Sequence, residues 1–230
     1  MNVIEIKGLT KIYKTSEVIV KAVNGIDINF EEGEFTAIVG PSGSGKTTFL
    51  NMLGGLDKPT SGKVIISGID VWKLSSRQLI DFRMNNIGFV FQSYNLIPVL
   101  TAGENVEFIM HLQGKPKKER EKRTKDLLEA VGIGNRINAR PSKLSGGQQQ
   151  RVAVARALAS KPEFILADEP TANLDSKATN SLLELMSQMN KKYNTTFIFA
   201  THDQRVMDKA HRIVTIEDGK ILSDEYFERD

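Results

Sequence analysis

The sequence contains no cysteine and a single tryptophan among its 230 residues. Without cysteine the chain can form no disulfide, no thiolate metal site and no cysteine nucleophile, which fits a reducing compartment. No uninterrupted run of apolar residues is longer than four, so neither a transmembrane span nor the hydrophobic core of a signal peptide is expected. Any association with a membrane would therefore run through a partner protein.

Net charge is also small, because 31 Lys and Arg residues oppose 28 Asp and Glu residues and leave +3. This balance is too mild to indicate a nucleic-acid-binding protein, so no direct contact with nucleic acid is expected. The charge is uneven, however, since the segment from Lys115 to Lys125 holds seven basic residues and two acidic ones. Such a segment is most often the solvated face of a helix, but it could also face anionic lipid or RNA. The sequence leaves both interpretations open.

The length and the hydropathy pattern indicate one folded domain over residues 1–230. Hydrophobic residues make up 40% and charged residues 26%, as in soluble globular proteins. Strands are predicted at 3–10, 18–30, 35–39, 63–67, 87–91, 164–167, 196–200, 212–217 and 220–223. Helices are predicted at 47–53, from 101 to about 131 with an interruption at 114–116, and at 149–160, 176–190 and 203–210. Strand–helix alternation around a helical middle predicts an α/β core with a helical part inserted at about 93–160.

A glycine-rich segment connects the predicted strand 35–39 to the helix that follows it. Its residues are Gly40, Pro41, Ser42, Gly43, Ser44, Gly45, Lys46 and Thr47. They satisfy the pattern G-x-x-x-x-G-K-[ST] in the strand–loop–helix context that this motif requires. The glycines let the backbone curl, so that the N–H groups from Ser42 to Thr48 point into one anion-sized hollow at a helix N-terminus. Lys46 adds a mobile charge for the outer phosphates and the Thr47 hydroxyl is a hard ligand for Mg²⁺, so the segment predicts a nucleoside-triphosphate site.

Two carboxylates end the apolar strand that begins at Phe164. Adjacent side chains at a strand end point in different directions, so Asp168 and Glu169 can have different tasks. We expect Asp168 to orient Mg²⁺ beside the phosphate loop, and Glu169 to polarise a water for in-line attack on the γ-phosphate. An acidic pair at a strand end is weak evidence alone, but it becomes strong evidence beside a phosphate loop.

A second glycine turn, Leu144-Ser145-Gly146-Gly147-Gln148, precedes the helix predicted at 149–160. Ser145 is a plausible N-cap, so the segment could be no more than a good helix start. These five letters are rare by chance, which favours a functional interpretation. The segment then offers a second helix N-terminus to a phosphate, about a hundred residues after the first.

Together these motifs resemble the nucleotide-binding domain of an ABC-type ATPase over essentially the whole chain. Gly40–Thr47 resembles the Walker A loop, Phe164–Asp168 the Walker B strand and Leu144–Gln148 the family signature. The resemblance implies an α/β fold of the ABC ATPase type, with a P-loop NTPase core, an antiparallel β-subdomain and a helical signature subdomain. It also implies ATP hydrolysis with ATP and Mg²⁺ as cofactors.

The resemblance extends to single residues outside these three motifs. Gln92 is similar to the family's Q-loop glutamine, which contacts Mg²⁺, and His202 to the switch histidine at the γ-phosphate. Asn173-Leu174-Asp175 resembles the D-loop, and Tyr13 stands where an adenine-stacking aromatic is usual. The implied catalytic residues are Lys46, Gln92, Glu169 and His202, and the implied metal ligands are Thr47, Gln92 and Asp168. The implied nucleotide contacts are Tyr13, residues 40–48 including Thr48, and Ser145, Gly147 and Gln148.

The resemblance implies a head-to-tail homodimer in which the signature of one subunit closes over the ATP of the other. It also implies an integral membrane permease as partner, and hence a place on the cytoplasmic, inner face of the cell membrane. The wording from Gly88 to Val106 and from Arg140 to Arg151 is most similar to lipoprotein-release, macrolide-export and cell-division ATPases of the LolD, MacB and FtsE types. Two other functions are compatible with the phosphate loop. One is a soluble ABC-type ATPase that acts on ribosomes or nucleic acid, and the other is a small-molecule kinase, which leaves the signature unexplained.

Overall fold

The computed structural model describes residues 2–14 and 18–228. Its strands are β1 (Asn2–Lys14), β2 (Ile19–Glu31), β3 (Phe35–Val39), β4 (Ser61–Ile66), β5 (Ile69–Asp70), β6 (Ile87–Phe91), β7 (Phe164–Asp168), β8 (Thr196–Ala200), β9 (Arg212–Glu217) and β10 (Lys220–Tyr226). Its α-helices are α1 (Lys46–Leu53), α2 (Ser76–Asn86), α3 (Ala102–Leu112), α4 (Lys117–Ala130), α5 (Gly146–Ala159), α6 (Ser176–Tyr193) and α7 (Gln204–Lys209). Within the described ranges, no helix is both long and apolar enough to cross a bilayer.

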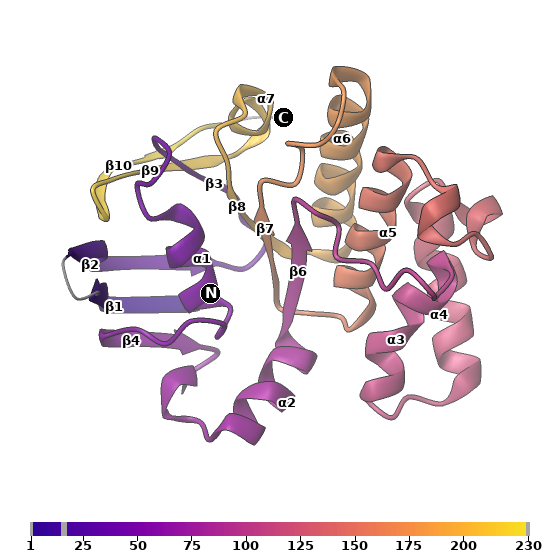
Figure 1. The fold of residues 1–230 in the computed structure, drawn as a ribbon, viewed down its shortest axis with the longest axis horizontal. Helices are drawn as coiled ribbons and strands as arrows, with labels where there is room; N and C mark the ends of the chain where they lie inside the picture. The colour runs from indigo at the N-terminus through magenta and orange to yellow at the C-terminus, as the bar shows by residue number, and fades with distance from the viewer. Residues whose placement is uncertain (1, 15–17, 229–230) are drawn as a thin grey trace.

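Two sheets organise the molecule. β2, β1, β4 and β5 form an antiparallel sheet, whereas the larger sheet has the order β10-β9-β3-β8-β7-β6. In the larger sheet β9, β3, β8, β7 and β6 run parallel and β10 pairs antiparallel with β9. Figure 1 shows the antiparallel sheet on one side of the molecule and α3, α4 and α5 on the other, with β6 and β7 between them. The predicted fold class, mixed α/β with an antiparallel sheet and a helical part, is therefore what the chain adopts.

The inner parallel strands are buried on both faces, and their side chains divide the core in two. Phe35, Phe197 and Phe199 pack on the side of α3, α5 and α6, whereas Ile38 and Ile198 pack with α1 and the antiparallel sheet. Alternate residues of a strand point to opposite faces, so each short apolar run supplies both halves of the core. Because β3, β8, β7 and β6 are neighbours and parallel, the loops that follow them emerge at one edge of the sheet.

Several elements begin or end away from their predicted positions. The first strand was predicted to end at Thr10 but continues to Lys14, past a pairing irregularity near Gly8, whose φ is +57°. α5 begins three residues before its prediction because Ser145 caps it. The predicted helical insert, about 93–160, contains α3, α4 and α5; that the chain is one domain with this insert as a subdomain stays a prediction.

Candidate nucleotide site

The loop between β3 and α1 has the backbone that the glycine-rich motif predicts. Gly40, Gly43 and Gly45 all have φ between +81° and +145°. A Cβ at Gly45 would lie 2.0 Å from the Ala22 backbone oxygen, so this position requires glycine. Within the described residues, no backbone acceptor takes a hydrogen bond from the N–H groups of Gly43, Gly45, Lys46, Thr47 and Thr48. These free donors at a helix N-terminus form an anion-binding hollow.

Lys46 lies over this loop. Its ammonium nitrogen donates to the backbone oxygens of Gly40 and Pro41, at 2.8 and 2.9 Å. The residue is 9% exposed, so the charge is held close to the loop rather than extended into solvent. An ammonium in this position can exchange its carbonyl partners for phosphate oxygens.

Asp168 and Thr47 meet beside the loop. The Thr47 hydroxyl donates to Asp168 Oδ1 at 3.1 Å, across 121 residues of sequence. Burial raises the pKa of the Asp168 carboxyl, and the hydrogen bond from Thr47 offsets part of that rise. A half-buried carboxylate and a hydroxyl are hard oxygen ligands of the kind that Mg²⁺ takes together with phosphates.

Glu169 lies in a strained turn at the end of β7. Its φ is +46°, which a residue with a Cβ adopts only when the surrounding structure imposes it. Its Oε1 lies 2.7 Å from His202 Nδ1, and its Oε2 accepts from the Thr201 hydroxyl at 3.3 Å. The turn therefore points the carboxylate at the end of β8, where it can accept a proton from a bound water.

One pocket joins these groups to Gln92, which follows β6. Its volume is about 570 Å³, and it is lined by Ala22, Gly40, Pro41, Ser42, Gly43, Gly45, Lys46, Thr47, Thr48, Gln92, Glu169 and His202. Of the predicted site residues, Ser44 and Asp168 lie just behind this lining, where Ser44 Oγ is buried and has no partner among the described residues. Ala22 is the one lining residue that sequence reasoning did not find, because no motif marks it; its backbone oxygen lies against Gly45 of the loop.

Tyr13 lies outside the lining of this pocket. Its hydroxyl donates to Asp57 Oδ2 at 2.5 Å, and the Lys11 ammonium lies 5.0 Å from the centre of its ring. Burial and the hydrogen bond to Asp57 raise the pKa of the Tyr13 phenol. The residue is 41% exposed, so part of Tyr13 is accessible from solvent.

The signature segment is placed apart from the pocket. The Ser145 side chain caps α5 by accepting from the Gln148 N–H, and the Gln148 side chain accepts from the Ser145 N–H. Neither residue, nor Gly147, lines the nucleotide pocket of its own chain. Figure 1 places α5 and α1 on opposite sides of β6 and β7. The start of α5 is therefore not part of the nucleotide pocket of the same chain.

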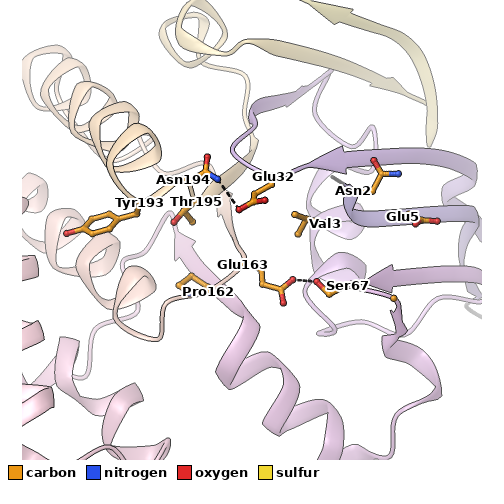
Figure 2. A pocket seen from close by; sticks show the side chains of 11 residues that line it. Asn2, Val3, Glu5, Glu32, Ser67, Pro162, Glu163, Tyr193, Asn194 and Thr195 are labelled. Atoms are coloured by element: carbon orange, nitrogen blue, oxygen red, sulfur yellow. Dashed lines mark hydrogen bonds between the residues drawn. The ribbon is translucent and has the colours of Figure 1, made fainter.

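A second cavity of about 590 Å³ lies at the opposite edge of the large sheet. Figure 2 shows its walls, which come from the start of β1, the Ser67 turn, the segment before β7 and the end of α6. Glu32 accepts from Asn194 at 2.9 Å, and Glu163 accepts from the Ser67 hydroxyl. Carboxylates already bound to neighbours, with no cation among the lining residues, make this cavity unsuited to phosphate.

The basic stretch from Lys115 to Lys125 belongs to α4 and the turn before it. Most of its cations have partners: Lys115 with Glu119, Lys117 with Glu121, Arg120 with Glu107, and Lys125 with Glu129. The Arg123 guanidinium donates to the last carbonyls of α5, at Leu158 and Ala159. This pairing favours the solvated helix face over a patch for RNA or lipid.

In this parallel sheet β3 leads through a phosphate loop into a helix, and β7, which is separated from β3 by β8, ends at an acidic pair, Asp168 and Glu169. This arrangement defines a P-loop nucleoside-triphosphate-binding protein. The model of the ABC transporter family matches residues 23–172, and this chain belongs to that family. Its resemblance to the ABC ATPases, predicted from the motifs, is thereby confirmed.

Individual relatives are also ABC ATP-binding proteins. An uncharacterized ABC transporter ATP-binding protein of Thermotoga maritima is 52% identical and covers 95% of this chain and 93% of its own length. The lipoprotein-releasing system ATP-binding protein LolD 1 of Rhodopseudomonas palustris is 46% identical, and the match covers 96% of this chain and 98% of that protein. The macrolide export ATP-binding/permease protein MacB of Hyphomonas neptunium is 47% identical, but this chain spans 34% of it.

A solved structure also matches. It is a dimer of the ATP-binding cassette MJ0796 in a post-hydrolysis state, bound to ADP and Pi, with a TM-score of 0.89 and 43% identity. The match covers 99% of this chain and 100% of that one. The present chain is accordingly an ATP-binding ABC subunit with ATPase activity.

Proposed function

We propose that this chain powers a membrane complex of the export or lipoprotein-release type, as a homodimer that closes around two ATP molecules. The proposal rests on one observation above all. The phosphate loop and Glu169 line one pocket, whereas the capped start of α5 lies outside it. Each chain thus carries two halves of a site that do not meet, and a second copy would bring them together. The LolD and MacB relatives favour the export or lipoprotein-release branch.

In the proposed mechanism the loop N–H groups and Lys46 hold the β- and γ-phosphates, and Ser145, Gly147 and Gln148 of the second copy close over them. Glu169 accepts a proton from a water that attacks the γ-phosphorus in line. The bond from that phosphorus to the bridging oxygen breaks, leaving ADP and phosphate. His202, bound to Glu169, orients the carboxylate and reaches the γ-phosphate. Tyr13 is proposed to stack its ring on the adenine.

Mg²⁺ is proposed to bind with the nucleotide. Thr47, Asp168 and Gln92 would hold it, and it would neutralise charge on the phosphate oxygens. The chemistry of these groups fits, because all three offer oxygen atoms. Among the described residues, no three His, Asp or Glu side chains gather into a metal cage of their own. A cation bound partly by phosphates needs no such cage.

The permease partner is proposed to dock against the groove between β6, α3 and α5. This groove has a volume of about 290 Å³ and a mainly apolar lining that includes Phe89, Phe91, Phe108 and Leu112. Phe108 and Leu112 are 42% and 53% exposed, so large apolar side chains at this groove are accessible to a partner. β6 also leads directly into Gln92, so a partner in this groove would lie beside the nucleotide site. Such docking would place the chain on the cytoplasmic face of the membrane.

Co-purification tests the proposal. Tagged Glu169→Gln protein would be trapped with ATP and Mg²⁺ in its own cells and purified from detergent-solubilised membranes. Mass spectrometry should find a membrane protein with few spans and a large extracytoplasmic domain. Phe108→Asp, added to this trapped chain, should prevent co-purification of the partner, and in the otherwise wild-type chain it should leave ATP hydrolysis unchanged. Ile80→Asp, at an exposed apolar residue of α2, should preserve both co-purification and hydrolysis. Ribosomes or nucleic acid without a membrane protein would overturn the proposal.

A further inference from the structure

Gln150, the fifth residue of α5, carries a buried side-chain amide that no proposed step uses. Its side chain is fully buried, and its Nε2 donates to two backbone oxygens, Pro170 O at 2.8 Å and Phe91 O at 3.3 Å. Pro170 directly follows Glu169, and Phe91 directly precedes Gln92. One side chain therefore holds the two segments that carry the proposed general base and the proposed metal-binding glutamine.

Packing alone does not account for glutamine at this position. Gln150 Oε1 is buried and has no hydrogen-bond partner among the described residues. An unsatisfied buried acceptor lowers stability, whereas a methionine of similar length would fill the same space without one. The presence of glutamine here, in spite of its unsatisfied oxygen, is better explained by the two hydrogen bonds that its Nε2 donates.

The held segments need such support. Glu169 has the strained φ of +46°, and the turn after it is joined to the Gln92 segment again where Asn173 Nδ2 donates to Gln92 O at 3.0 Å. Strain of this kind persists only where neighbouring contacts fix the backbone. The Gln150 amide is such a contact, because Pro170 O has no other hydrogen bond among the described residues.

We propose that Gln150 is a positioning residue that fixes Glu169 relative to Gln92 for hydrolysis, without contacting ATP itself. The inference rests on the proposed roles of Glu169 and Gln92. It requires that loss of the Gln150 amide lowers kcat and leaves nucleotide binding almost unchanged, because the phosphate loop makes none of these contacts.

The test compares Gln150→Met with Asn190→Leu in the full chain with Mg²⁺ and ATP. Asn190 is a matched control, since its buried Nδ2 also donates to backbone oxygens, at Gly33 and Thr195, at the sheet edge away from the nucleotide. Gln150→Met should lower kcat about ten- to a hundredfold, as a small displacement of a reacting group does, with KM changed by about twofold or less. Asn190→Leu should lower the melting temperature with kcat changed by less than about twofold.

The inference is overturned if Gln150→Met leaves kcat unchanged. It is also overturned if Gln150→Met and Asn190→Leu lower the melting temperature equally and Gln150→Met lowers kcat no more than Asn190→Leu does. If Gln150→Met does not fold, Gln150→Glu keeps the shape, removes the amide nitrogen and is measured in the same way. If neither variant folds, Gln150 serves the fold and the inference is wrong. Glu169→Gln, measured in parallel, separates the two levels: normal hydrolysis there would refute the catalytic role of Glu169 rather than the contact with Gln150.

Discussion

Among single residues of the candidate site, Asp168 is one whose burial costs stability. Its half-buried carboxyl has a raised pKa, because burial disfavours the charged form more than the Thr47 hydroxyl stabilises it. The folded protein therefore keeps this proton at pH values where the unfolded chain has released it. The resulting stability is present below the carboxyl's unfolded pKa and is lost as the pH rises through the folded pKa.

Asp168→Asn should consequently stabilise the nucleotide-free protein at neutral pH. The amide keeps an oxygen for Thr47 and carries no charge to bury, so the free energy of unfolding should rise at pH 7. The gain over the wild type should shrink as the pH falls toward the unfolded pKa. Urea denaturation of both proteins at several pH values, without nucleotide or Mg²⁺, measures this difference in the free energy of unfolding. A gain that is the same at every pH would mean that desolvation of the carboxylate is not the cause.

The Tyr13 side chain could act through its ring, by stacking on adenine, or through its hydroxyl, by the hydrogen bond to Asp57. If its ring stacks on adenine, Tyr13→Ala should weaken ATP binding by about 1–3 kcal/mol, or roughly five- to 150-fold in Kd. Tyr13→Phe keeps the ring and removes only the hydrogen bond to Asp57, so its affinity should stay near that of the wild type. Titration with a fluorescent ATP analogue measures the Kd of each variant and so distinguishes the two roles. Equal losses in both variants would assign the effect to the Asp57 contact instead of to stacking.

At the scale of elements, α2 and α5 offer a natural comparison. Both begin with a Ser-x-x-Gln capping box, Ser75 with Gln78 and Ser145 with Gln148. Aspartate caps a helix as well as serine does, so Ser75→Asp and Ser145→Asp should each change stability by less than about 0.5 kcal/mol. Only Ser145→Asp places a carboxylate where a partner's γ-phosphate is proposed to bind. It should lower ATPase activity by about tenfold or more, while Ser75→Asp should not.

Thermal melts and steady-state hydrolysis of both variants give this result directly. Equal activity in the two would contradict a phosphate-binding role for the start of α5. Loss of activity together with a large loss of stability in Ser145→Asp alone would instead indicate that the cap geometry differs between the two helices.

Elements whose signal is local could be predicted from the sequence, and those that depend on distant contacts could not. The glycine loop, the start of α3 after Thr101 and the buried strands β3, β6 and β8 each depend on a few adjacent residues. α2 was missed because none of its residues is buried, so it carries no clear periodic pattern. The bonds from Tyr13 to Asp57 and from Gln150 to Pro170 join residues that no motif links.

At the scale of the whole molecule, one chain holds its phosphate loop and its signature on different sides of β6 and β7 (Figure 1). In the proposed mechanism a partner signature binds only when a γ-phosphate is present, so ATP should join two copies and hydrolysis should release them. Glu169→Gln removes the proposed general base but leaves the pocket's shape. It should slow hydrolysis about 10²- to 10⁴-fold and so preserve the joined state.

Size-exclusion chromatography with light scattering should therefore find Glu169→Gln at 25.6 kDa without nucleotide and at twice that mass with ATP. Adding Lys46→Ala to the same chain should abolish the shift, since the loop then loses its mobile charge for the outer phosphates. Adding Ser145→Asp should abolish it as well, although that chain still binds ATP in its own pocket. An ATP-dependent dimer that survives Ser145→Asp would mean that the two copies meet through another surface, and the proposed closure over the partner's ATP would be wrong.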